Sequence, residues 1–101
     1  MRSRSRRFTD LVDRQLDLFE QDEAELIRDT ESALAAYNRA ERDEAEERYG
    51  DYLDHVDAGL DALLDLREAY AATLPEETDD EYREEFNGRA RKRVPQFSLG
   101  L

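Results

Sequence analysis

The fold is decided by residues 49–74, YGDYLDHVDAGLDALLDLREAYAATL. Eight positions in this stretch follow one another at alternating spacings of four and three residues, and only Arg67 among them is not apolar. This spacing is typical of a helix that packs along one seam, as in a coiled coil. The seam positions are Tyr49, Leu53, Val56, Leu60, Leu63, Arg67, Tyr70 and Leu74, and Leu64 lies beside the seam and broadens it.

The bounds of this helix follow from the residues that flank the seam. Asp43 followed by Glu46 is a capping pattern for a helix N-terminus. Pro75 disfavours helical geometry in the residue before it. The sequence therefore predicts a helix over 43–74.

Upstream, apolar residues also recur at helical spacing, from Phe8 to Tyr37. The phase of this stripe survives the polar stretch Glu20–Glu25, which favours one continuous helix over 8–39. The alternative is a break near Gln21, with Asp22 as the N-cap of a second helix.

The two apolar stripes are rotated by about 100° if a single helix is extended through both. One uninterrupted helix cannot present both stripes to the same neighbour. We therefore expect a turn within Asn38–Arg42, which makes the two long helices an antiparallel hairpin.

The region after Pro75 predicts a short third helix and a tail. Thr78 and Glu81 form a capping box that starts a helix over 79–93. Asn87-Gly88 offers an earlier stop. The last eight residues, 94–101, carry no charged side chain and keep alternate apolar residues, so we expect them to be largely extended.

Composition limits the class of protein. The chain has 101 residues, 27 acidic against 15 basic, a net charge of -12 and no cysteine. One domain is all that this length allows, and the lack of cysteine excludes disulfides, zinc–thiolate sites and thiol nucleophiles. No apolar run approaches the roughly 20 residues of a membrane-spanning helix. The expectation is a soluble, cytoplasmic, all-α protein.

The charges are sorted along the chain into an acidic body over 8–93, a basic N-terminal arm over 1–7 and basic residues before the tail of 94–101. Such arms are able to contact phosphates, but the acidic body opposes a broad nucleic-acid footprint. The basic residues are Arg2, Arg4, Arg6, Arg7, Arg89, Arg91, Lys92 and Arg93.

The apolar content predicts self-association. Leu, Ile, Val and Phe number only 21, and a two-helix contact scarcely offsets the conformational entropy lost on folding. Two hairpins forming a twofold-symmetric four-helix bundle solve this problem. The predicted contact residues are Tyr49, Leu53, Val56, Leu60, Leu63, Leu64, Tyr70 and Leu74. The alternative is a monomer in which the third helix and the tail cover the open face.

The sequence contains few residues that could act in catalysis or bind a metal ion. His55 is the only histidine, with Asp51 and Asp54 as its available carboxylates. A row of acids at helical spacing lies opposite the seam, where a solvated face belongs, and no calcium-binding loop accompanies it. This acidic ridge comprises Asp51, Asp54, Asp57, Asp61, Asp65 and Glu68. We predict no enzyme activity, no metal and no cofactor.

The sequence thus predicts a non-enzymatic interaction or scaffold protein, homodimeric and with a docking tail that carries Phe97, Leu99 and Leu101. The tail has a second interpretation, in which it packs back on the hairpin. The alternative function is a DNA mimic or nucleic-acid-associated regulator that acts through the acidic body or the arms. A metal site at a subunit interface around His55 is a third class.

Overall fold

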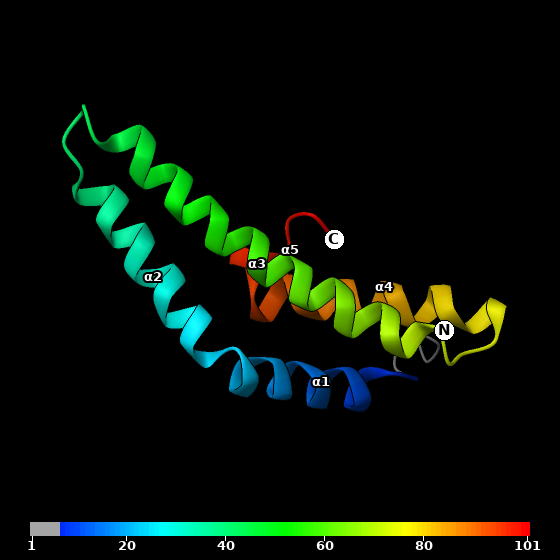
Figure 1. Ribbon diagram of the computed structural model, residues 1–101. Helices are drawn as coiled ribbons and strands as arrows, with labels where there is room; N and C mark the ends of the chain where they lie inside the picture. The colour runs from blue at the N-terminus through cyan, green and yellow to red at the C-terminus, as the bar shows by residue number, and fades with distance from the viewer. Residues whose placement is uncertain (1–6) are drawn as a thin grey trace.

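The computed structural model describes residues 7–101, and these form an elongated all-helical molecule of 51 × 23 × 21 Å with no strand in the described range. The elements, in chain order, are α1 (Thr9–Asp22), α2 (Ala24–Arg39), α3 (Ala45–Ala71), α4 (Glu76–Arg93) and α5 (Pro95–Ser98). In Figure 1, α2 and α3 lie side by side and run in opposite directions, α4 lies behind the second half of α3, and α1 packs against α4.

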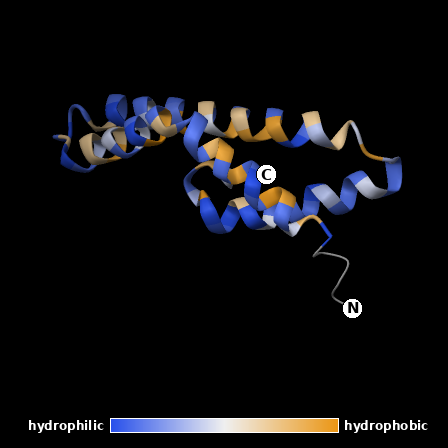
Figure 2. Ribbon diagram, turned by 90° about the horizontal axis from the view of Figure 1, so that it is seen from below, coloured by the Kyte–Doolittle hydropathy of each residue, from blue (hydrophilic) through white to orange (hydrophobic). Residues whose placement is uncertain are grey.

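The hydrophobic core lies at one end of the molecule. Its buried side chains come from α1, the second half of α3, α4 and the segment around α5. Figure 2 shows the hydrophobic residues gathered where these helices meet, whereas hydrophilic residues dominate the tip of the α2–α3 pair. The core members are Phe8, Val12, Leu16, Phe19, Leu63, Ala71, Tyr82, Phe86, Ala90, Val94 and Phe97.

Tyr82 is at the centre of this core. Its ring lies 4.9 Å from that of Tyr70 and 5.5 Å from that of Phe8, measured between centroids. The Tyr82 hydroxyl donates a hydrogen bond of 2.9 Å to Oε1 of Gln15, which is also buried. This bond satisfies two polar groups that would otherwise be costly to bury.

The prediction of one continuous helix over 8–39 is wrong, because the chain bends at Glu23. Glu23 has φ −107° and ψ 25°, yet its N–H still donates to the carbonyl of Phe19 at 2.8 Å. The bend lets the apolar stripe of α1 face α4 while that of α2 faces α3. The proposed cap at Asp22 does not form, since α2 begins after Glu23 without a side-chain cap.

The ends of the α2–α3 connection also differ slightly from expectation. α2 ends at Arg39, where the first long helix was predicted to end, and the connection covers 40–44, which overlaps the predicted turn of Asn38–Arg42 and extends two residues beyond it. Glu44 occupies the N-cap position of α3 and makes no side-chain capping bond, so the predicted cap by Asp43 is wrong. The continuous helix α3 nevertheless spans nearly all of the predicted 43–74.

The C-terminal region departs most from the sequence prediction. α4 begins at Glu76, directly after Pro75 and three residues before the predicted start, without a side-chain cap from Thr78. It then continues through Gly88 to Arg93. The prediction of an extended tail is wrong, because Pro95–Ser98 forms the single turn α5.

Candidate functional site

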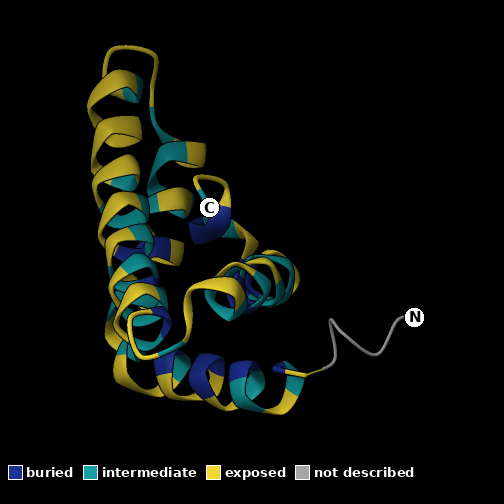
Figure 3. Ribbon diagram, turned by 90° about the vertical axis from the view of Figure 1, so that its right-hand side faces the viewer, coloured by how far each residue is buried: buried dark blue, intermediate teal, exposed yellow. Residues whose placement is uncertain are grey.

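Beyond the core, α2 and α3 project as a two-helix arm, which we define as residues 28–58. Ile27 still packs against the core and Gly59 is buried, but between them Thr30 is the only buried residue. The Thr30 hydroxyl is satisfied by donating to the carbonyl of Leu26 at 2.7 Å. Figure 3 shows the contrast, with buried residues at the α1 end and exposed ones at the arm tip.

Apolar side chains are exposed along one side of this arm. Leu34 is 39% exposed, Leu53 38% and Tyr49 45%. The rings of Tyr37 and Tyr49 join the two helices, with centroids 5.1 Å apart. Leu34 lies one turn before Tyr37 on α2, and Leu53 one turn after Tyr49 on α3, so each leucine adjoins one ring of the Tyr37–Tyr49 pair. We call Leu34, Tyr37, Tyr49 and Leu53 the apolar patch.

The other predicted contact residues are divided by the fold. Leu63 is fully buried in the core. Tyr70 and Leu74 are half-buried and pack against the core of the same chain. Val56, Leu60 and Leu64 are half-buried along the middle of α3. Of the eight predicted self-association residues, only Tyr49 and Leu53 are exposed, and both belong to the apolar patch.

The predicted docking residues of the tail fold onto the chain itself. Phe97 is 1% exposed, and its ring lies 6.0 Å from that of Phe19. It also lies against the backbone of Gly59. Leu101 is half-buried against the core, whereas Leu99 is 90% exposed. The intramolecular interpretation of the tail therefore describes Phe97 and Leu101, and Leu99 alone is open to solvent.

The basic residues near the C-terminus belong to α4 and two of them bind α1. Arg89 forms an ion pair of 3.0 Å with Asp13. Arg93 contacts Asp17 at 2.7 Å and Glu20 at 2.8 Å, and these bonds raise the pKa of Arg93. Arg91 and Lys92 are exposed.

At the other end of the chain, Arg7 contacts Glu81 at 3.4 Å and its guanidinium lies 5.9 Å from the ring centroid of Phe8. Arg2, Arg4 and Arg6 of the predicted arm lie outside the described residues.

The acidic ridge runs along α3, and all six of its residues are exposed. Within residues 7–101, only the two ends of the ridge form ion pairs, Asp51 with Arg48 at 4.0 Å and Glu68 with two arginines. Asp54, Asp57, Asp61 and Asp65 therefore face solvent as uncompensated carboxylates.

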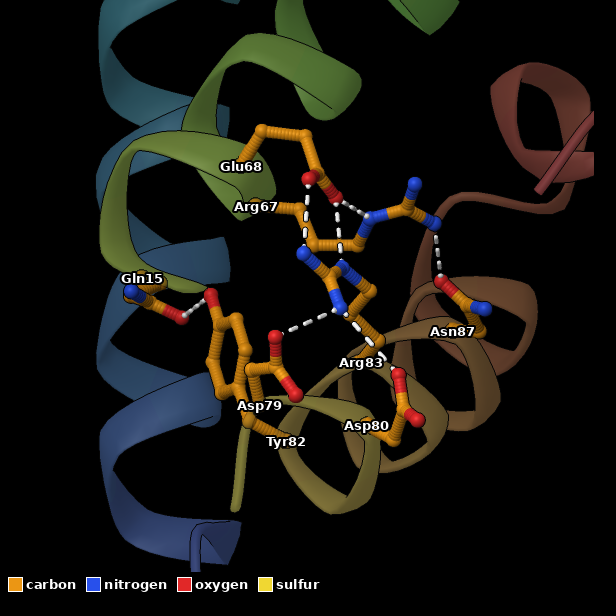
Figure 4. A network of polar contacts seen from close by, with 8 residues as sticks. All are labelled: Gln15, Arg67, Glu68, Asp79, Asp80, Tyr82, Arg83 and Asn87. Carbon is orange, nitrogen blue, oxygen red and sulfur yellow. Dashed lines mark hydrogen bonds and ion pairs between the residues drawn. The ribbon is translucent and has the colours of Figure 1, made fainter. Parts of the chain in front are cut away.

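Figure 4 shows how Glu68 joins α3 to α4. It accepts hydrogen bonds from Arg83 at 2.9 and 3.0 Å and from Arg67 at 2.8 Å. These bonds, that from Arg83 first, hold the pKa of Glu68 at about 2, below its usual value of 4.5. Arg67, the one charged residue on the seam, also donates to Oδ1 of Asn87 at 2.9 Å. The exception in the heptad pattern is therefore a structural link between helices.

His55 does not form the carboxylate pair that the sequence allowed. Its Nδ1 lies 2.8 Å from the backbone carbonyl of Asp51, and because a carbonyl oxygen only accepts, Nδ1 carries the proton. The ring borders an open depression of about 390 Å³ between α2 and α3, which Asp29 and Arg48 also line. Across residues 7–101, no three histidine, aspartate or glutamate side chains gather closely enough to hold a metal ion.

Sequence reasoning missed Leu34 and Tyr37 as surface residues. Both continue the N-terminal stripe at helical spacing, and nothing in that spacing separates Leu34, which is exposed, from Leu16, which is fully buried. Comparison with protein-family models, with curated proteins and with solved structures finds no match to this chain. None of the helices within 7–101 is long and apolar enough to cross a membrane.

Proposed function

We propose that this chain is a non-enzymatic protein-interaction module whose binding element is the α2–α3 arm. The observation that carries the proposal is the separation of the core from the arm. The buried apolar side chains all come from α1, α4, α5 and the second half of α3 or the residues beside them, and α2 contributes none. The arm therefore adds no fully buried apolar side chain to the fold, yet it presents three exposed apolar ones.

The chemistry of the arm favours binding over catalysis. Its exposed groups include the ring of Tyr49, the side chains of Leu34 and Leu53, ten carboxylates and four guanidinium groups. Aromatic residues that protrude from a rigid helix are common anchors at protein–protein interfaces, since they bury a large area at a small entropic cost. A nucleophile–base pair would need Nε2 of His55, the ring nitrogen left as an acceptor when Nδ1 donates to the Asp51 carbonyl, to receive a hydrogen bond from a hydroxyl group, and no side chain within residues 7–101 donates one to it.

The test is chemical cross-linking in native cells followed by identification of the partners. We expect L34S/L53S to remove the partners that the wild-type chain captures. The matched control is L18S, because Leu18 is a leucine 54% exposed on α1, outside the arm. Partners that survive L34S/L53S but disappear with L18S would place binding elsewhere and refute the proposal.

A second copy of the chain is the second candidate partner, and the observation that favours it is the position of Tyr49 and Leu53 on the heptad seam. In this candidate, the predicted four-helix bundle is replaced by a dimer in which only the arms of the two copies are in contact. Analytical ultracentrifugation over a hundredfold dilution measures the oligomeric state of the chain. A shift from dimer to monomer that L34S/L53S abolishes would support this candidate, and a monomer at every concentration would reject it.

A further inference from the structure

The chemistry around the apolar patch specifies the kind of partner that fits it. In a helix, the surface neighbours of a residue are those three or four positions away. Within α2 and α3, the charged residues at this spacing from the patch are Glu31, Glu46 and Asp57, and all three are exposed. None of these carboxylates forms an ion pair within the described part of the chain.

The arginines of the arm do not lie at the helical positions that border the apolar patch. The arm contains four, Arg28, Arg39, Arg42 and Arg48, and none is three or four positions from a patch residue. Arg48 is directed instead to Asp51. The arm as a whole has ten acidic residues against four basic ones, a net charge of −6. The patch is therefore an apolar strip bordered by carboxylates alone.

We infer that the patch binds a basic amphipathic helix of a partner protein. Its apolar side chains would cover Leu34, Tyr49 and Leu53, and its lysines or arginines would pair with Glu31, Glu46 and Asp57. The patch suits a helix because its residues cover about one turn of α2, from Leu34 to Tyr37, and about one turn of α3, from Tyr49 to Leu53, so the apolar face of a short partner helix is long enough to cover it. This inference rests on the proposed function and adds the chemistry of the partner.

Two other occupants of the patch fit less well, namely a second copy of the chain and the chain's own basic N-terminal residues. A second copy would bring its own acidic arm against these carboxylates, and like charges across an interface are unfavourable. The basic residues of this chain's own N-terminus start beside Phe8, which packs in the core at the opposite end from the arm tip. Arg2, Arg4 and Arg6 lie within five positions of Arg7, a distance along the chain of at most about 20 Å, which is less than half of the 51 Å length of the molecule.

The experiment uses the full chain and three labelled peptides of 14 residues. The first has leucines at i, i+3, i+4, i+7 and i+11 and lysines on its flanks. The second has the same composition in scrambled order, and the third replaces each lysine by glutamate. Fluorescence anisotropy measures binding at low and high salt. We expect the first peptide to bind most tightly, by about tenfold over the scrambled one, and to weaken as salt rises.

Matched variants locate the site. The triple variant E31Q/E46Q/D57N removes three carboxylates from the border of the patch, and D54N/D61N/D65N removes three from the acidic ridge. Both change the net charge equally. We expect the border variant to weaken peptide binding about tenfold and the ridge variant less than about threefold. L34S/L53S should weaken it at least about tenfold, while L18S should leave it unchanged.

Several outcomes would overturn the inference. Equal binding of the scrambled peptide, or equal losses in the two triple variants, would mean diffuse attraction to an acidic body, as the DNA-mimic hypothesis requires. No binding of the first peptide, or preference for the acidic one, would also reject it. If L34S/L53S still removed cellular partners in that case, the proposed function would stand and only the partner chemistry would be wrong.

Discussion

The ring of Phe97 in α5 occupies the space that a side chain at position 59 of α3 would fill. A Cβ built on Gly59 overlaps with Cδ1 and Cε1 of that ring and lies 2.6 Å from Cγ. Phe97 is itself 1% exposed and packs edge-on against Phe19. The absence of a side chain at Gly59 thus allows the C-terminal turn to close the core.

The first prediction concerns this contact. G59A should destabilise the chain by about 1–3 kcal/mol, because the new methyl group forces Phe97 out of its position. G50A is the matched control, since Gly50 is exposed in the same helix and a Cβ there meets nothing within 4 Å. It should stabilise the chain by about 0.5–1 kcal/mol through helix propensity. Urea denaturation measures both, and a gain for G59A would contradict the contact.

The second prediction separates core from arm along one seam. Leu63 is fully buried, so L63A should cost about 2–5 kcal/mol of unfolding free energy. Leu53, ten residues earlier, is 38% exposed, and L53A should cost less than about 1 kcal/mol. Thermal unfolding followed by circular dichroism compares them. Similar losses for the two variants would show that the arm is covered in solution.

The third prediction concerns the buried hydrogen bond between α4 and α1. Y82F removes the donor and leaves Oε1 of Gln15 buried without its partner, at a cost of about 1–3 kcal/mol. Q15L in the same background should return part of this loss, because the orphaned acceptor is then gone. A double-mutant cycle in urea measures the coupling. Additive effects of Y82F and Q15L would argue that the bond is absent.

The fourth prediction is a pH dependence. Glu68 has a pKa lowered to about 2, so its bonds to Arg83 and Arg67 stabilise the fold fully above its usual value of 4.5. This stabilisation is lost as the pH falls through about 2. E68Q should therefore reduce stability above pH 5 and converge with the wild type near pH 2. Since the Glu68 side chain is 46% exposed, solvent screening keeps the difference below about 1 kcal/mol.

The control for this titration is E84Q, which removes an exposed carboxylate of α4 that forms no ion pair within residues 7–101. Its difference from the wild type should stay small over the same range. A difference for E68Q that persists unchanged down to pH 2 would contradict the assignment of the bonds to the ionised carboxylate.

The spacing of apolar residues was sufficient to predict the long helices, but it did not predict which parts of each helix are buried by other helices. Leu53 and Leu63 both lie on the heptad seam, yet one is exposed and the other buried, because α4 and α5 cover only the second half of α3. The bend at Glu23 has no glycine or proline to mark it, and Asp22, the capping residue that the sequence offered for a break nearby, makes no side-chain cap bond. Phe97 looked like part of an extended tail because its cavity is created by Gly59, 38 residues away.

The patch shows the same limit. The sequence predicted Tyr49 and Leu53 as contact residues and the two long helices as an antiparallel hairpin, but it did not fix the register that brings Tyr37 of α2 within 5.1 Å of Tyr49 of α3. The border of carboxylates follows from this arrangement, since it depends on which residues of two helices surround one surface.

The lack of any fully buried apolar side chain in α2 also has a dynamic consequence. Local opening of a helix costs little where few apolar contacts are lost, so the amide protons of α2 and of the first half of α3 should exchange with solvent before those of α1 and α4. The arm would then unfold and refold many times within one lifetime of the intact core. A partner bound to Leu34 and Leu53 would slow that exchange. Hydrogen–deuterium exchange would then show increased protection of amide protons in the arm and not elsewhere.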